Sequence, residues 1–324
     1  MKQNDNGKSF EFAIGEMLAK KAEAFTAVEF VEDTRYVNCK KAFNSSSPDE
    51  QKRFMESAAL PLATLFRLEP AICNPKSSDD ILYIALNSDA AGIAGVVRDV
   101  LLSRKNAKGR TIWEIGISAK NNHDAVKHSR LSPLIDFGKE WMGAPCSEAY
   151  MKEAATIFGR VMKWKEDGVK TWSDIGGDKE KYVYIPLLEA FKDEMIRLFR
   201  SGDKTMAENL ILYLIGRKPF YKVIKQDRNA MVVMKAFNFC KGLGERYNGI
   251  MPDCRPDKIP LPTRMVELAY SDKGEQRNSL SLILDYGWQV DFRIHNASSA
   301  LENSLKFDIR LVGNPPVLFT QHVF

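Results

Sequence analysis

An acid and a lysine in two neighbouring apolar segments constrain the fold of this chain more than any other feature. Residues 96–102 form an apolar run that contains Asp99, and residues 111–119 form a second run that is followed directly by Lys120. The residues between the runs predict a hairpin turn: Lys105, Lys108, Gly109 and Arg110. A carboxylate among apolar residues needs a partner. We therefore expect two adjacent strands on which Asp99 meets Lys120 or a metal ion.

Alternation along the second strand separates an apolar face from a polar one. The polar face carries Glu114, Gly116, Ser118 and Lys120. A structural ion pair between Asp99 and Lys120 is the simplest interpretation of the two residues alone. A polar cluster follows them at once: Asn121, Asn122, His123, Lys127, His128 and Arg130. This cluster favours the start of a helix that binds phosphate through side chains and free N–H groups.

An amphipathic helix is predicted to begin near Ser9, because its apolar residues recur on one arc at helical spacing. Those residues are Phe10, Ile14, Met17, Leu18 and Phe25. Glu11 falls within the same arc, and a carboxylate on a buried helix face is unusual. The alternative is an edge position from which the Glu11 side chain curls into water.

The rest of the chain predicts a mixed α+β protein. We expect a helix over residues 49–68, a strand over 81–86, mainly helix over 148–217, and several strands after 220. The proline-rich segment 252–262 is the best candidate boundary. The predicted division is a core with the N-terminal helix and the strands of Asp99 and Lys120 over 1–140, a helical elaboration with a hairpin over 141–255 and a β-rich region over 256–324, or one compact domain.

Composition excludes several classes of protein. We find no apolar run of 18 residues, and Asn4, Asp5 and Asn6 make a poor secretory leader, so neither a membrane span nor a signal peptide is expected. The five scattered cysteines form no CxxC pair and suit a reducing cytoplasm. A net charge of +5 permits a polyanionic partner without establishing one.

Two longer runs resemble a known family. EIGISAKNNHDAVKHSRLS, over residues 114–132, and FRIHNASSALENSLKFDIRLVG, over residues 292–313, are similar to the HaeIII-type family of type II restriction endonucleases. The helix glutamate, the strand acid and the x-x-Lys signature resemble the PD-(D/E)XK nuclease superfamily. Because the two runs lie far apart, the resemblance covers nearly all of the chain.

The resemblance implies an α/β nuclease core, a central mixed sheet flanked by helices, with helical and β-rich elaborations. It also implies Mg²⁺-dependent hydrolysis of both strands of double-stranded DNA at the palindrome GGCC in a bacterial cytoplasm. Asp99 matches the strand acid, Lys120 the signature lysine and Glu11 the helix glutamate. Asp99, Glu11 and the Ala119 carbonyl would then hold Mg²⁺, while Lys120 positions the attacking water. A palindrome suits a homodimer, although some restriction enzymes act as monomers.

One position departs from the superfamily pattern. The usual second acid lies two residues before the lysine, where this chain has Ser118. A hydroxyl is a poor replacement for a carboxylate on a hard cation, so Ser118 is expected to bind a metal-bound water. Glu114 is too far from Lys120, about 20 Å along an extended strand. Glu11 is the preferred second acid, ahead of Asp124 and Asp136.

DNA contacts are assigned to two regions. Asn121, Asn122, His123, Lys127, His128 and Arg130 are expected to contact the phosphate backbone without reading sequence. Base contacts are expected from residues that end a strand and begin a turn: Arg293, His295, Asn296 and Ser298. For Asn296 and Ser298 the alternative is a structural role as turn caps.

Three other functions compete with a restriction endonuclease. A sequence-specific DNA-binding protein with a decayed nuclease site would explain the missing acid at Ser118, and it would show no turnover with Mg²⁺. A repair nuclease of the same superfamily would cut without a fixed tetranucleotide. A serine hydrolase that uses Ser118 and Lys120 is disfavoured, since the known S-x-x-K arrangement has a different spacing and opens a helix.

Overall fold

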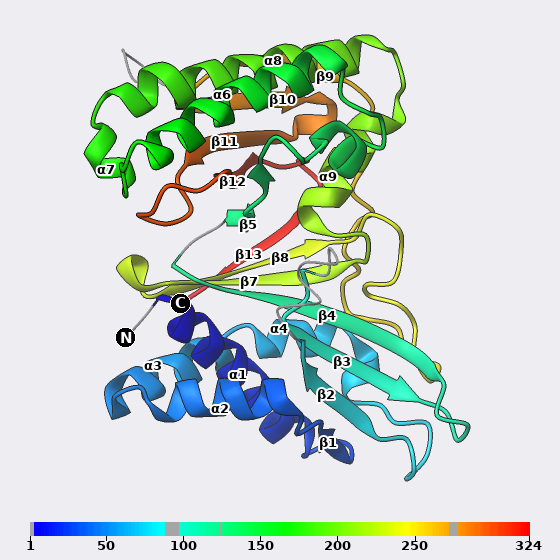
Figure 1. The fold of residues 1–324 in the computed structure, drawn as a ribbon. Helices are drawn as coiled ribbons and strands as arrows, with labels where there is room; N and C mark the ends of the chain where they lie inside the picture. The colour runs from blue at the N-terminus through cyan, green and yellow to red at the C-terminus, as the bar shows by residue number, and fades with distance from the viewer. Residues whose placement is uncertain (1–2, 88–96, 123–124, 272–277) are drawn as a thin grey trace. The chain divides into compact units, whose positions relative to one another are not determined.

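A computed structural model describes residues 3–87, 97–122, 125–271 and 278–324. The chain forms two compact units (Figure 1). The first unit comprises Met1–Asp124, Gly216–Ile259 and Val317–Phe324, and the second comprises Ala125–Ile215 and Pro260–Pro316. The units interleave along the chain, and one boundary between them, after Ile259, lies within the segment 252–262. The division into domains expected from the sequence stays a prediction. Within the described residues, no helix has the length and apolarity needed to cross a membrane.

The first unit is built on a mixed seven-stranded sheet within the described residues. Its strands, in spatial order, are β1 (Val28–Phe30), β2 (Leu82–Leu86), β3 (Val100–Lys105), β4 (Thr111–Asn121), β7 (Phe220–Gln226), β8 (Met231–Phe237) and β13 (Phe319–Val323). The β1–β2 and β4–β7 pairs are parallel, and the other pairs are antiparallel. The predicted hairpin of β3 and β4 is confirmed, with Val100 opposite Ile117.

Helices of the first unit pack on this sheet through the predicted apolar arc. Helix α1 (Gln3–Ala22) contacts β2, β3 and β4, and α2 (Thr34–Asn44) and α3 (Pro48–Ala59) contact α1. Phe10, Ile14 and Leu18 are fully buried with Ile115 and Ile117. Phe25 lies beyond the end of α1 and is exposed, so its predicted place on the buried arc is wrong.

The helix predicted over 49–68 is two helices. α3 ends at Ala59 and α4 (Leu62–Leu68) begins after Pro61, because proline lacks the N–H that a continuous helix would use. Helix α3 begins with a capping box in which the Ser47 and Glu50 side chains bind each other's backbone N–H. A short helical turn, Pro70–Ile72, follows α4.

The second unit pairs its strands into a separate antiparallel sheet (Figure 1). The order is β5 (Ala125–Lys127), β12 (Leu305–Gly313), β11 (Gln289–His295), β10 (Ser279–Leu284) and β9 (Met265–Tyr270), with β6 (Arg130–Leu131) also on β12. Its helical elements are Gly138–Met142, α6 (Glu148–Glu166), α7 (Trp172–Ile175), Glu180–Tyr184, α8 (Ile185–Arg200) and α9 (Thr205–Ile215). Phe191 of α8 packs on Phe292 of β11 and Phe307 of β12. The face of the sheet that is covered by α8 is therefore apolar.

A buried carboxylate in the first unit gives stability a defined pH dependence. Glu69 is fully buried, and its Oε1 accepts hydrogen bonds from the Tyr221 hydroxyl (2.7 Å) and the Gly244 N–H (2.8 Å). Burial raises the pKa of Glu69 from 4.5 to about 7, against the effect of those hydrogen bonds. Protonated Glu69 therefore makes its full contribution to the stability of the folded state below pH 4.5. This contribution is lost as the pH rises through 7.

We therefore expect the unfolding free energy of the wild type to fall by about 2 kcal/mol relative to Glu69→Gln between pH 5 and pH 8. Denaturant unfolding of both proteins across this pH range measures how the difference between their unfolding free energies changes with pH. A difference that is the same at every pH does not affect this test. Glu56→Gln, at an exposed position on α3, is the control and should run parallel to the wild type. Parallel curves for Glu69→Gln would contradict the prediction.

Candidate active site

Asp99 lies directly before β3 and receives three hydrogen bonds on one oxygen. Its Oδ2 accepts from the Ala119 N–H (2.7 Å), the Ser118 hydroxyl (3.2 Å) and the Lys120 ammonium (3.4 Å). The Asp99 N–H donates to the Ile117 carbonyl at 2.8 Å, which continues the pairing of the hairpin. The predicted contact between Asp99 and Lys120 is therefore confirmed, with both side chains still about one-fifth exposed.

Glu11 brings a second carboxylate from α1. The residue is 8% exposed, so the alternative in which its side chain curls into water is wrong. Arg35 of α2 donates to Glu11 Oε2 at 2.7 Å, and the Cys39 thiol lies 3.7 Å from the same oxygen. Burial, and then the negative charge of Asp99, raise the pKa of Glu11 to about 7, while Arg35 and Lys120 act in the opposite direction. Glu11 thus lies within electrostatic reach of both Asp99 and Lys120.

The donor set fits one hard divalent cation. Carboxylate oxygens are the ligands that Mg²⁺ prefers, and a cation would relieve the repulsion between Asp99 and Glu11 that raises the pKa of Glu11. The described residues contain no group of three or more His, Cys, Asp or Glu side chains that could hold a metal. The Ser118 hydroxyl already donates to Asp99 and supplies no third acid.

The other acids weighed for the second carboxylate are bound elsewhere or lie outside the described residues. Glu114 forms ion pairs with Arg98 (2.7 Å) and Lys218 (3.1 Å). Asp136, in the second unit, accepts the N–H groups of Lys139 and Cys146, each at 2.9 Å. Asp124 is outside the described residues.

The sequence analysis did not anticipate Arg98. Its aliphatic stem crosses Gly116, where an added Cβ would lie 2.1 Å from Arg98 Cδ. Only glycine leaves room for this crossing, and the crossing carries the guanidinium to Glu114 on the polar face of β4. The glycine between two polar positions of a strand was the signal for this close approach. The crossing thus forms an Arg98–Glu114 ion pair of 2.7 Å on the strand that carries Ser118 and Lys120.

Asn122 anchors the end of β4 just past Lys120. Its backbone has a φ of 62°, its N–H donates to the Lys225 carbonyl at 2.8 Å, and its side-chain oxygen accepts from the Asp227 N–H at 2.8 Å. The Asn122 amide also donates to the Asp227 carboxylate. The Asn122 side chain is therefore hydrogen-bonded to the β7–β8 turn. A contact of Asn122 with DNA phosphate stays a prediction.

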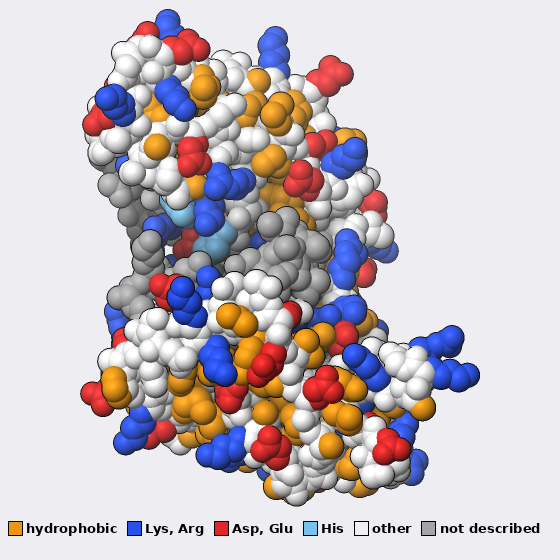
Figure 2. Space-filling model, turned by 60° about the horizontal axis from the view of Figure 1, so that its bottom comes forward, with side chains coloured by type: hydrophobic (Ala, Val, Ile, Leu, Met, Phe, Trp, Pro, Cys, Tyr) orange, Lys and Arg blue, Asp and Glu red, His pale blue; other side chains and the backbone are white. Residues whose placement is uncertain are grey.

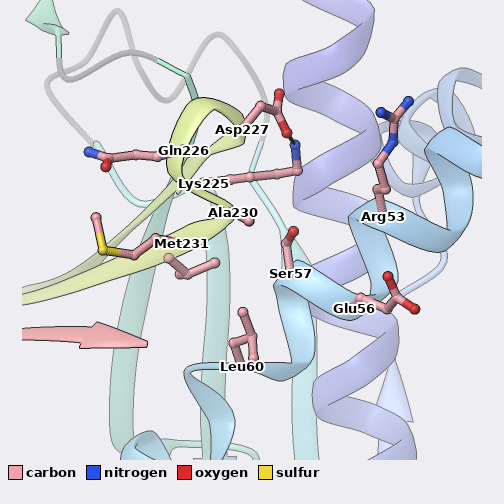
Figure 3. Close-up of a pocket in the computed structure, with 10 residues that line it drawn as sticks. Arg53, Glu56, Ser57, Leu60, Lys225, Gln226, Asp227, Ala230 and Met231 are labelled. Atoms are coloured by element: carbon pink, nitrogen blue, oxygen red, sulfur yellow. Dashed lines mark hydrogen bonds and ion pairs between the residues drawn. The ribbon is translucent and has the colours of Figure 1, made fainter. Parts of the chain in front are cut away.

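A cavity of about 290 Å³ lies beside this turn in the first unit (Figure 3). Its charged lining residues are Arg53 and Glu56 of α3, Lys225 of β7 and Asp227 of the β7–β8 turn. A smaller cavity that also includes Arg53, Lys225 and Asp227 is lined by Asn121 and Asn122. Asn121 is therefore placed one residue beyond Lys120 at the wall of a polar cavity.

The prediction of a phosphate-binding helix after Lys120 is wrong. Residues 125–127 and 130–131 form β5 and β6, which pair with β12 and complete the second sheet. Lys127 does not extend into solvent: its ammonium lies 3.5 Å from the centre of the Tyr213 ring and donates to the Tyr213 carbonyl at 3.2 Å. Burial lowers the pKa of Lys127 to about 8. His123 lies outside the described residues.

The remaining predicted DNA contacts are all in the second unit. Arg130 is paired with Glu302 (3.1 Å) and donates to the Ser304 hydroxyl (2.8 Å), and His128 and Arg293 are exposed. Asn296 accepts from the Tyr184 hydroxyl (3.2 Å) and donates to the Ser298 carbonyl. His295 Nδ1 lies 2.8 Å from the Asn296 carbonyl oxygen, and the Ser298 hydroxyl donates to the Ala300 carbonyl (3.3 Å). These contacts match the turn-cap alternative for Asn296 and Ser298.

The surface charge is mixed. In the view of Figure 2, Lys and Arg side chains are interspersed with Asp and Glu side chains and form no single basic patch. The net charge of +5 therefore does not locate a nucleic-acid surface by itself.

An acid pair next to a lysine, at the end of a β-hairpin and against a helix, is the arrangement expected of a metal-dependent hydrolase of phosphodiesters. The comparisons with known proteins agree with that class. Residues 7–315 match the family model described as HaeIII restriction endonuclease. The type II restriction enzyme HaeIII of Haemophilus aegyptius is 34% identical over 317 residues, which cover 98% of this chain and 96% of that protein.

The chain therefore belongs to the HaeIII restriction endonuclease family and is a type II restriction endonuclease by class. Membership implies DNA binding and, in general terms, a divalent metal cofactor. No solved structure is significantly similar to the chain, so the placement of the site rests on the geometry given above.

Proposed function

We propose that this protein is a Mg²⁺-dependent endonuclease of the PD-(D/E)XK superfamily that hydrolyses both strands of duplex DNA at GGCC. The observation that carries the proposal is the set of three donors on Asp99 Oδ2, one of them Lys120, with the buried Glu11 carboxylate electrostatically coupled to the same pair. A salt bridge that served stability alone would not need a second, unfavourably buried acid beside it.

Each residue has a role that follows from its contacts. Asp99 and Glu11 would hold Mg²⁺, with the Ala119 carbonyl as a third protein ligand. The Ala119 N–H and the Ser118 hydroxyl orient the Asp99 carboxylate, and Ser118 would hydrogen-bond a metal-bound water. A bound Mg²⁺ supplies a Lewis acid for the scissile phosphate and lowers the pKa of a coordinated water.

Lys120 completes the site. Its ammonium lies 3.4 Å from Asp99 Oδ2, so its position is set before the substrate arrives. A positive charge held there stabilises the negative charge that develops on the phosphate oxygens, and it orients the attacking water by hydrogen bonding. Because the group is already in place, no reorganisation is needed at the moment of reaction.

Specificity for GGCC is supported by the resemblance of residues 114–132 and 292–313 to the HaeIII-type family. A palindromic site is compatible with a homodimer, and a protein that cuts DNA inside a bacterium would act in the cytoplasm. The proposed contacts to the DNA backbone remain those expected from the sequence: Asn121, Asn122, His123, Lys127, His128 and Arg130.

Digestion of a sequenced plasmid with purified protein tests the proposal. We expect discrete fragments that end within GGCC when Mg²⁺ is present and none when a chelator is present. Discrete fragments that end elsewhere would retain the chemistry and contradict the specificity. Random fragments would favour a less specific nuclease, and intact plasmid with DNA still bound in a gel shift would favour a binding protein without catalysis.

A further inference from the structure

The sheet of the second unit has one apolar face and one polar face. Alternate residues of β11 and β12 are fully or almost fully buried: Val290, Phe292, Ile294, Phe307, Ile309 and Leu311. Figure 1 shows α6 and α8 along this sheet, and Phe191 of α8 contacts the apolar face. The intervening residues form the β11–β12 polar face, which consists of Asp291, Arg293, His295, Lys306, Asp308 and Arg310.

The register arranges this face as alternating donors and acceptors. Asp291 lies opposite Arg310, Arg293 opposite Asp308, and His295 opposite Lys306. Three permanently positive side chains stand against two carboxylates, so the face keeps a net positive charge that complements DNA.

Two details leave hydrogen-bonding capacity on the face unused. Arg310 Nη2 lies 3.0 Å from Asp308 Oδ2, and the Arg310 side chain is 58% exposed. This contact orients the guanidinium while leaving most of its five donors available. Asp291 Oδ1 is shielded from solvent and accepts no hydrogen bond from the described part of the chain.

We infer that the β11–β12 polar face reads G·C base pairs of duplex DNA, a step that rests on the proposed function. Arg293 and Arg310 donate to guanine O6 and N7, and Asp291 and Asp308 accept from cytosine N4. Side chains two apart on a strand are spaced by about 6.7 Å, close to two base-pair steps of about 3.4 Å each. The readout thus comes from the strands rather than from the turn at Asn296 and Ser298.

Cleavage kinetics on altered duplexes test this inference. The cut site of the wild type is first found by sequencing fragment ends, and kcat/KM is then measured on duplexes in which one base pair of that site is changed at a time. We expect Arg310→Gln to reduce discrimination at one G·C pair by about 10- to 100-fold. Arg310→Lys should fail to restore it, because an ammonium lacks the bidentate fork of a guanidinium. Asp308→Asn should also reduce discrimination at that pair.

Control variants separate base contacts from other roles. Arg200→Gln changes an exposed arginine at the end of α8 and should leave every ratio unchanged. A uniform loss of activity on all duplexes that Arg310→Lys restores would mark a phosphate contact and overturn the inference, as would wild-type ratios in all three variants. A wild type that makes no metal-dependent cut would overturn the proposed function itself, which distinguishes the two failures.

Discussion

Lys120→Ala is expected to lower the single-turnover rate of DNA cleavage by about 100- to 1,000-fold, the effect of removing one preorganised charge-stabilising group. The Lys120 ammonium lies 3.4 Å from Asp99 Oδ2, where it neither closes a cavity nor supports the core. Its removal therefore affects the chemical step more than the fold. DNA affinity in the presence of chelator should change little, because binding uses many contacts across the protein.

Lys218→Ala is the matched control for this experiment. Lys218 is a second lysine that pairs with an acid of β4, since its ammonium lies 3.1 Å from Glu114. It lies outside the acid pair and should retain cleavage within a few-fold of the wild type. If Lys120→Ala cleaves at the wild-type rate and only its thermal unfolding midpoint falls, the Asp99–Lys120 contact is structural and the proposed mechanism is wrong.

Local patterns predicted the elements of this fold better than their assembly. The β3–β4 hairpin and the strands after residue 220 were expected from alternation and turn residues, and the structure confirms them. The return of β7, β8 and β13 to the first sheet was not expected. Strand pairing between distant segments leaves no local periodicity, so sequence patterns alone could not predict that the chain leaves the first unit and comes back twice.

Helix α2 shows a signal that was present and missed. Asp33 caps this helix by accepting the Tyr36 N–H at 2.9 Å, and Tyr36, Cys39 and Phe43 recur at helical spacing on its buried side. Because α2 was not predicted, neither was Arg35, the partner of Glu11.

The phosphate-binding helix wrongly predicted after Lys120 has a different cause. The sequence over 121–131 is mostly polar and carries no periodicity, so only pairing with the distant strand β12 determines that residues 125–127 and 130–131 form strands.

The candidate site was predictable where it depended on one hairpin and uncertain where it depended on packing. Hairpin register alone placed Asp99 beside Ser118 and Lys120. The position of Glu11 relative to Asp99 and Lys120 depends on how α1 packs on the sheet. The apolar arc predicted which face of α1 is buried, but not where along the sheet the helix lies. Arg98 over Gly116 required a contact between two side chains that no spacing rule describes.

Glu11→Gln is the sharpest test of how this site replaces the acid that Ser118 lacks. If Glu11 is the second metal ligand, we expect the Mg²⁺ concentration for half-maximal cleavage to rise by at least about 10-fold, since even supporting residues of metal sites contribute that much. Saturating Mg²⁺ should not restore the wild-type rate. Folding should be retained, because glutamine can still accept the Arg35 hydrogen bond that now reaches Glu11 at 2.7 Å.

Two substitutions make this result specific to Glu11. Glu16→Gln changes another carboxylate of α1, a half-buried one, and should leave the Mg²⁺ dependence unchanged. Asp136→Asn removes the alternative acid, whose carboxylate accepts local N–H groups in the second unit, and should also preserve it. A wild-type Mg²⁺ requirement in Glu11→Gln together with a raised one in Asp136→Asn would transfer the second ligand to Asp136. Glu11 would then be only the buried partner of Arg35, and Asp99 would be the one acid that the first unit supplies to the metal.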